Sequence, residues 1–368
     1  MRGRRTLTGR YAAVCAVTVL WLGIPAQSHA ADQKWEDVVK AAEQEGEVAV
    51  RGAPGRGYEE ALATSFRKDF PRIKLNFTGT PGRDAIPQML REREAGVHKW
   101  DVFVGGASSV LPTLKPAGAL APLKPALMLP EVLDDAAWQG GFDQGWMDNE
   151  KTYNFAFDFS WDPIINVNWD FVPKDTLTTF QDLLKPELAN KIVAIDPRVS
   201  GEGSVTAAIL ALNFGEDFLR DLLARQQVVY TTNRRQNAEW LVRGRYPVGF
   251  ATGEEEIAIF QREGIGKNVS ILRAPMPKVV GSSGFGTVAL MDKAPHPNAA
   301  KVYINWLLSK AGQANWKSTQ RNSRRTDVPP VRPDLVPPPG AGNIQVEALL
   351  ALREQAAKIA KESIPATR

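Results

Sequence analysis

The chain has 368 residues, 43% of them hydrophobic, and carries 45 basic against 41 acidic side chains. One hydrophobic core rarely serves more than about 250 to 300 residues, so this length predicts two lobes. The excess positive charge lies in residues 1–30, which contain four arginines and no acidic residue, so the rest of the chain is neutral. That balance, without any basic run that alternates with aromatic residues, gives no support for a nucleic-acid or membrane-surface partner, and none is expected.

The first thirty residues are organised like a secretory signal peptide. A basic start, "MRGRRTLTGR", precedes the apolar run "YAAVCAVTVLWLGIPA", and Ser28-His29-Ala30 offers small residues for cleavage. We predict a mature chain that begins at Ala31 and works in the periplasm. The alternative, an uncleaved anchor, would need about 20 apolar residues. Arg4-Arg5 leaves the twin-arginine route open beside the general one, and the only cysteine, Cys15, is lost with the signal.

After the signal, helical and extended patterns alternate, as in a parallel α/β sheet. The predicted elements are helices at 35–46, 58–71 and 85–96 and strands at 47–52, 73–79 and 100–106. Open α/β sheets bind ligands beyond the carboxyl ends of their strands. Polar residues near these strand ends are therefore candidate ligand contacts, namely Arg51, Thr80, Arg83 and Ser108.

Residues 153–162 alternate with a period of two. Aromatic side chains occupy the odd positions from Tyr153 to Trp161, and mostly polar ones occupy the even positions from Asn154 to Asp162. This period predicts an extended strand with one aromatic face. The face either packs on the core or forms a wall against which a ligand stacks. In both cases we expect the strand to pass between the lobes.

The second lobe is expected to contain strands at 191–196, 227–232 and 246–252 and helices at 205–214, 216–225 and 233–244. Between the first of these strands and its helix lies a turn with four small residues, Ser200, Gly201, Gly203 and Ser204. Backbone N–H groups and the positive end of the helix dipole would face a cleft here. Together with Arg198 they suit a carboxylate or phosphate. The alternative is an ordinary helix cap beside a surface arginine.

Two further polar clusters follow the later strands of this lobe. Asn233 and Arg234 come after strand 227–232, where they contact a ligand or merely begin a solvated helix. Glu254, Glu255 and Glu256 come after strand 246–252. Such a run is ordinarily a solvated first turn that complements the helix dipole, and its functional alternative is a set of oxygen ligands for a metal.

Several segments occur in a distinctive order. "NVNWDFVP", "TFQDLLKPELANKIVAIDP" and "RVSGEGS" lie within 166–204, and "GFGTVALM" and "APHPNAAKVYINWLLSKAGQANW" follow at 284–316. This order resembles the family 1 extracellular solute-binding proteins, the ligand-capturing subunits of ABC importers, and is similar to the ferric-iron, phosphonate and thiamine binders among them. The resemblance covers nearly the whole mature chain.

The resemblance implies an α/β, two-lobe periplasmic-binding-protein fold of type II, in which each lobe is a sheet flanked by helices and hinge strands join the lobes. Lobe 1 would comprise 31–152 and 272–368, and lobe 2 would comprise 153–271 with the hinge strand. The terminal amphipathic pattern at 344–362 is expected to cover the first lobe. The resemblance places the equivalents of the iron-ligating tyrosines of ferric-ion binders at Glu254 and Glu255 of this chain. Phenolate ligation of iron is therefore not expected here.

The predicted function is the substrate-binding component of an ABC importer, which closes on a small anionic solute and delivers it to an inner-membrane permease. One alternative is a ferric or other metal complex held by Glu254 and Glu255, and another is a solute-sensing adaptor. Catalysis is not expected, because the only histidines after the signal, His98 and His296, belong to no metal motif and no P-loop or nucleophile elbow occurs. We expect a monomer without a cofactor.

Overall fold

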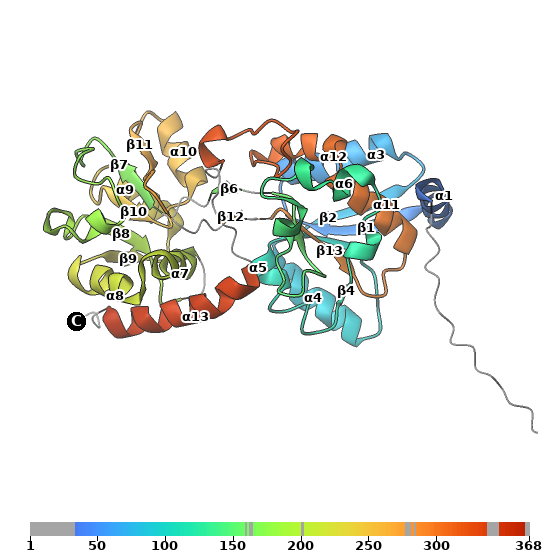
Figure 1. Ribbon diagram of the computed structural model, residues 1–368, viewed down its shortest axis with the longest axis horizontal. Coiled ribbons are helices and arrows are strands. Elements are labelled where there is room, and N and C mark those ends of the chain that lie inside the picture. The colour runs from blue at the N-terminus through green and yellow to red at the C-terminus, as the bar shows by residue number, and fades with distance from the viewer. Residues whose placement is uncertain are drawn as a thin grey trace, which may run out of the picture. The chain divides into compact units, whose positions relative to one another are not determined.

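The computed structural model describes residues 34–158, 160–161, 165–199, 202–276, 281–282, 285–336 and 346–364 (Figure 1). The predicted signal peptide and its cleavage site lie outside these residues. Residues Trp35–Arg368 form one compact unit, in which the described strands make two larger sheets and one two-stranded ribbon. None of the described helices is long and apolar enough to cross a membrane.

The first sheet combines strands from both halves of the chain, in the order β2-β1-β3-β13-β4, with β5 also paired to β13. Its strands are β1 (Glu47–Gly52), β2 (Lys74–Gly79), β3 (Val102–Gly105), β4 (Leu120–Ala121), β5 (Phe155–Ala156) and β13 (Thr287–Met291). β1 runs parallel to β2 and to β3, as the alternating patterns predicted, whereas β13 is antiparallel to β3. The sheet is therefore mixed, and its fourth strand returns from late in the sequence.

Eight helices flank this sheet among the described residues. They are α1 (Trp35–Glu45), α2 (Arg56–Glu59), α3 (Ser65–Asp69), α4 (Gly82–Glu94), α5 (Ala107–Val110), α6 (Pro130–Leu133), α11 (Pro297–Leu308) and α12 (Lys310–Ala314). The helix predicted at 58–71 is divided into α2, a π-helical turn at Glu60–Thr64 and α3. Aromatic rings tie the returning helix α11 to this divided helix.

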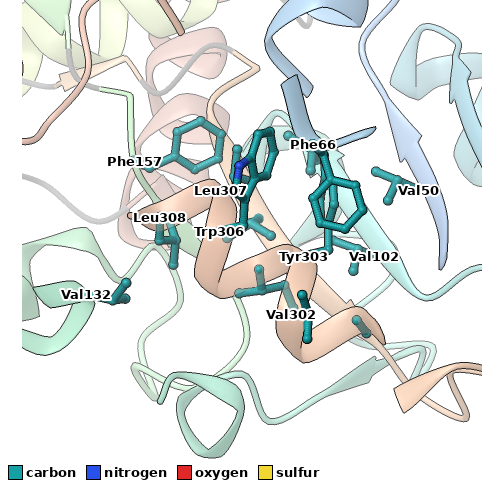
Figure 2. Close-up of a cluster of buried hydrophobic side chains, with 14 of the residues drawn as sticks. Val50, Phe66, Val102, Val132, Phe157, Val302, Tyr303, Trp306, Leu307 and Leu308 are labelled. Carbon is teal, nitrogen blue, oxygen red and sulfur yellow. The ribbon is translucent and has the colours of Figure 1, made fainter. Parts of the chain in front are cut away.

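Figure 2 shows that contact, where Phe66 of α3 lies against Tyr303 and Trp306 of α11 with ring centroids 5.1 and 5.2 Å away. Both polar tips find partners, because the Tyr303 hydroxyl donates to the Leu62 carbonyl at 2.9 Å and the Trp306 Nε1 donates to Asp69 Oδ2 at 2.8 Å. Tyr303 and Trp306 therefore add packing energy without leaving their own hydrogen-bonding groups unsatisfied.

The aromatic strand enters the core of the first sheet. Phe155 and Phe157 are fully buried in its main apolar cluster, which confirms core packing for these two rings. The polar face of this segment is buried as well, because Asn154 and Asp158 are fully buried. Asn154 Nδ2 donates to Thr287 Oγ1 of β13 at 3.0 Å, and Asp158 Oδ2 accepts from Arg321 Nε, so both polar side chains contact protein groups. Phe159 and the side chain of Trp161 lie outside the described residues.

The second sheet has the order β11-β7-β10-β8-β9. Its strands are β7 (Ile165–Asn168), β8 (Ile192–Ile195), β9 (Val229–Thr231), β10 (Val248–Phe250) and β11 (Val269–Ile271), and its helices are α7 (Glu202–Phe214), α8 (Glu216–Arg225), α9 (Arg234–Val242) and α10 (Glu254–Arg262). β8 is parallel to β9 and β10, whereas β7 and β11 are antiparallel to the strands beside them. The short strands β6 (Ser160–Trp161) and β12 (Gly281–Ser282) pair separately.

The terminal helix α13 (Val346–Ser363) packs mainly on the second sheet's helices α7 and α8, as Figure 1 shows in red. The prediction that it covers the first lobe is wrong. Its apolar side chains, among them Leu349, Ala356 and Ile359, belong to the second core, where they add a third helical surface to α7 and α8. Amphipathicity showed that the helix must be buried on one side, but it carried no information on which core receives it.

The first turn of α13 is bound to a different part of the chain. Glu347 accepts hydrogen bonds from Lys115 Nζ at 2.7 and 2.9 Å and from the Asn149 backbone N–H at 2.7 Å. Its own N–H donates to the Met147 carbonyl at 3.2 Å. Burial alone would lower the pKa of Lys115, but hydrogen bonds to Glu150 and Glu347 outweigh burial and raise it. We name these contacts of Glu347 the α13 clasp.

Replacing Glu347 by Gln is expected to lower the free energy of unfolding by about 1 to 2 kcal/mol, because a neutral amide loses the ion pair and one acceptor oxygen. Glu354→Gln is the matched control, since Glu354 is an exposed residue of the same helix, and its effect should stay below about 0.5 kcal/mol. Urea denaturation of both variants measures the difference. Equal values would mean that the clasp contributes nothing to stability.

Candidate functional site

Three loops of the second sheet meet at one edge, which we call the β8 edge. Because β8, β9 and β10 run parallel, their carboxyl ends lie side by side, and each is followed by one of the polar clusters predicted from the sequence. Arg234 connects them, since its Nη1 donates to Glu202 Oε1 at 2.8 Å and its Nε lies 3.0 Å from Glu256 Oε1. The structure therefore brings together Glu202 and Glu256, which lie 54 residues apart in sequence.

Arg198 is fixed from two directions at this edge. Its Nε and Nη2 donate to Asp196 Oδ1 at 2.9 Å and Oδ2 at 2.8 Å, and its guanidinium carbon lies 5.5 Å from the centre of the Tyr230 ring. A fork-to-fork pair combined with ring stacking holds the guanidinium plane in one orientation. Its Nη1 has no acceptor among the described residues, so this side of the fork remains available to an outside oxygen.

The contacts around Arg198 shift the pKa values of three neighbouring groups. Burial alone would raise the pKa of Asp196, but the hydrogen bonds and positive charge of Arg198 outweigh burial and lower it. The pKa of Arg198 is raised, chiefly by the hydrogen bond to Asp196. Burial raises the pKa of Tyr230, whose hydroxyl is buried and lacks a partner among the described residues. The site thus contains a carboxylate, a guanidinium and a neutral phenol at physiological pH.

The turn after β8 requires glycine at 203. A methyl group there would lie inside contact distance of the Ile195 carbonyl oxygen and 2.8 Å from that of Asp196, so the first turn of α7 packs directly on the strand end. Ser204 is buried beside it. Ser200 and Gly201, which sequence reasoning placed at the helix N-terminus, lie outside the described residues.

The other two clusters of this edge have structural as well as candidate functional contacts. Asn233 caps α9, because its Oδ1 accepts from the Gln236 N–H at 3.1 Å. Glu254 and Glu255 begin α10, but their side chains lie outside the described part of the chain. Among the residues that the structure describes, no group of three or more His, Cys, Asp or Glu side chains could hold a metal ion.

The first sheet has a corresponding edge at the carboxyl ends of β1, β2 and β3, which we call the β1 edge. The Thr80 N–H donates to the Gly52 carbonyl at 2.9 Å, which joins the loops after β2 and β1. Ser108 lies exposed on α5 directly after β3. Arg83 belongs to α4, and its side chain is not among those described.

Arg51 behaves differently from the other first-sheet candidates. It is 4% exposed, its Nη2 donates to Gln88 Oε1 at 2.9 Å, and its guanidinium lies 4.8 Å from the centre of the Trp100 ring. Burial lowers the pKa of Arg51, although Glu92 opposes this effect. Its side chain is thus packed between β1 and α4, where a ligand contact would need rearrangement.

Sequence reasoning missed two aromatic residues at the β1 edge. Tyr58 of α2 and Phe285, which directly precedes β13, meet edge to face with ring centroids 5.4 Å apart. No periodic pattern singles them out, since they lie more than 200 residues apart. The only sequence signal was their position near the end of a strand. The sequence analysis used that signal to select polar residues and not aromatic ones.

Residues 49–314 match the family of bacterial extracellular solute-binding proteins. The chain belongs to this family. The resemblance inferred from motif order is thereby confirmed, and the matched range of this solute-binding protein spans all three strand-end clusters of the β8 edge. None of the curated proteins compared with it matches.

Solved structures share the fold at low sequence identity. An iron- and citrate-bound IdiA (FutA) from Trichodesmium is 17% identical with a TM-score of 0.67, over 86% of this chain and 99% of that one. Iron-bound HitA from Pseudomonas aeruginosa is also 17% identical, with a TM-score of 0.62 over the same shares. An ABC transporter protein from Clostridium perfringens is 16% identical with a TM-score of 0.66, over 86% and 100%. These likenesses confirm the predicted α/β binding-protein fold of type II.

Proposed function

We propose that this solute-binding protein is the periplasmic substrate-binding component of an ABC importer and captures a small anionic solute at the β8 edge. The observation that carries the proposal is the orientation of Arg198, whose Nε and Nη2 are held by Asp196 while Nη1 is left without an acceptor among the described residues. A guanidinium already held in place loses little side-chain entropy when it binds an oxyanion, so its hydrogen bonds contribute more to affinity.

The ligand contacts follow from the two edges. From the second sheet we assign the turn Arg198, Ser200, Gly201, Gly203 and Ser204, together with Asn233 and Arg234, and from the first sheet Arg51, Thr80, Arg83 and Ser108. Arg198 is the principal contact, because Arg234 is already shared by Glu202 and Glu256. Arg51 contributes only if its contact with Gln88 is released. Closing of the two edges on the solute would then present it to an inner-membrane permease.

A metal complex is the second candidate, and the carboxylates of the β8 edge favour it. Glu202 and Glu256 lie on either side of Arg234, and Glu254 and Glu255 stand directly before Glu256 in the chain. Hard oxygen ligands of this kind suit a ferric ion accompanied by an anion. Two of the proteins with the same fold were solved with iron bound, one of them with citrate as well.

We test the proposal on the full protein purified from its own host's periplasm. Native mass spectrometry is expected to show a small anion released on unfolding, and N-terminal sequencing is expected to begin at Ala31. Adding that anion back to the stripped protein should reduce the radius of gyration in small-angle scattering, because the solute contacts both edges only when they close. Tight binding without compaction would contradict capture between two lobes, and a released metal without an anion would support the second candidate.

A further inference from the structure

The two edges carry exposed apolar side chains beside their polar candidates. Phe285 at the β1 edge is 41% exposed, and Val199 at the β8 edge is 47% exposed. Val199 directly follows Arg198 in the chain, so the loop after β8 carries an exposed apolar residue as well as the arginine that we assign to the ligand. Burying an exposed large hydrophobic side chain against a partner lowers the free energy. At a binding edge such side chains indicate a partner with apolar surface.

The Phe285 ring packs against another aromatic ring on one side. Its ring meets Tyr58 edge to face at an interplanar angle of 78°, and Tyr58 in turn meets the buried ring of Trp316 at 5.7 Å. Trp316 is 1% exposed and also packs on Phe157 at 4.9 Å. A chain of aromatic contacts therefore runs from the core to Phe285, which supports one ring face at low entropic cost.

The position of Phe285 places it at the ligand side of the first sheet. It precedes β13, whose first residue Thr287 pairs with Gly105 at the end of β3, and the Thr287 hydroxyl donates to the Gly105 carbonyl at 2.7 Å. Tyr58 comes after β1 in the same way. Phe285 therefore lies at the same edge of the sheet as Thr80 and Ser108.

An exposed phenylalanine elsewhere has a different explanation. Phe171 is 53% exposed, but a methyl group on Gly244 would clash with its ring, so it covers this glycine closely. It follows β7, whose end pairs with the start of β10, and so lies at the opposite edge of the second sheet. Phe171 is consequently a matched control for Phe285.

We propose that the solute is an organic anion with an apolar body, and that Phe285 is a specificity-determining residue. The acidic group of the solute would bind Arg198. The hydrocarbon or aromatic body of the solute would lie against Phe285 and Val199. This inference rests on the proposed function and narrows its ligand class. A bare inorganic anion, or a ferric ion with a small inorganic partner, would leave both apolar side chains uncovered in the closed site.

The test uses probes that share a head group and differ in apolar surface. Titration calorimetry compares inorganic phosphate with phenylphosphonate, and acetate with benzoate and hexanoate. We expect the larger member of each series to bind at least tenfold more tightly. Phe285→Ala should weaken the binding of the larger members about tenfold, because the apolar surface that they bury against one face of the phenyl ring is lost. The affinities for phosphate and acetate should not change. Phe285→Tyr should restore the preference, and Phe171→Ala should leave it intact.

The outcomes separate this inference from the proposed function. Equal affinity across each series, binding of the inorganic members alone, or no binding of the organic anions overturns the apolar contact. If Arg198→Ala abolishes the binding of phosphate while Phe285→Ala changes nothing, the anion site stands and the inference fails. If Phe285→Ala weakens benzoate while Arg198→Ala does not, the apolar contact stands and the proposed anion site is wrong.

Discussion

Replacing Arg324 by leucine is expected to lower the free energy of unfolding by about 3 to 5 kcal/mol, the largest effect that we predict for a single substitution. Arg324 is 1% exposed and donates to the carbonyl oxygens of Gln139 at 3.0 Å, Gly141 at 2.9 Å and Ala156 at 3.1 Å. Leucine would leave these carbonyls buried without a donor.

Two aromatic rings complete the environment of this guanidinium. Its carbon lies 4.9 Å from the centre of the Trp138 ring and 5.1 Å from that of Phe155. Burial lowers the pKa of Arg324 to about 9, so the group is still charged at neutral pH. Because Phe155 and Ala156 form β5, the same contacts fix the start of the aromatic strand against the loop at 139–142.

Urea denaturation decides this prediction. Arg332→Leu is the matched control, because Arg332 is half-buried and pairs with Asp334 at 2.6 Å near the surface, so its loss should cost less than about 1 kcal/mol. Arg324→Lys should fall between the two, since an ammonium keeps the charge but cannot reach all the carbonyls. An Arg324→Leu protein that loses less than 1 kcal/mol would show that water or repacking satisfies the carbonyls.

Local patterns predicted most elements of this chain. The alternation from 35 to 106 gave the helices and the parallel strands β1 to β3, and the run "KIVAID" gave β8, because these signals depend on neighbouring residues alone. Pairings between distant segments could not be predicted in the same way. Neither the insertion of β13 beside β3 nor the docking of α13 on the second core leaves a trace in local sequence.

In the candidate site, too, local features could be predicted from the sequence and contacts between distant residues could not. That three polar clusters follow β8, β9 and β10 could be predicted, and parallel pairing places them at one edge. Their mutual contacts could not, because an ion pair such as Arg234 with Glu256 depends on side-chain positions. The buried Arg324 and the exposed Phe285 were missed for a related reason, since a charged residue ordinarily indicates a surface and an aromatic one a core.

Arg198→Ala is expected to weaken binding of the copurified anion about ten- to a hundredfold. Removing a charge-assisted hydrogen bond from a closed site costs roughly 1.5 to 3 kcal/mol, and each 1.4 kcal/mol is tenfold in affinity. Arg235→Ala is the matched control, because this neighbouring guanidinium lies over the Phe260 ring at 5.4 Å rather than against Asp196. Titration calorimetry of both variants should show little change for Arg235→Ala.

The pH dependence of this binding follows from the lowered pKa of Asp196. Asp196 is ionised in the folded protein above its ordinary pKa of about 4, so the pair that orients Arg198 is fully formed there. Its contribution is lost only as the pH falls through the lowered value in the folded state. Affinity for an anion that is itself fully ionised should therefore stay constant between about pH 5 and 8. A decline within that range would point to another titrating group.

Substituting Glu254 and Glu255 distinguishes an anionic ligand from a metal complex. An anion beside Arg198 gains nothing from Glu254 or Glu255 and is repelled if they turn toward it, so Glu254→Gln combined with Glu255→Gln should leave its binding nearly intact or slightly tighter. A ferric complex reverses the order of effects, because the carboxylates would then be its ligands and Arg198 would only hold the accompanying anion. Loss of binding in the double glutamine protein, with Arg198→Ala unaffected, would establish the metal as the ligand that the β8 edge recognises.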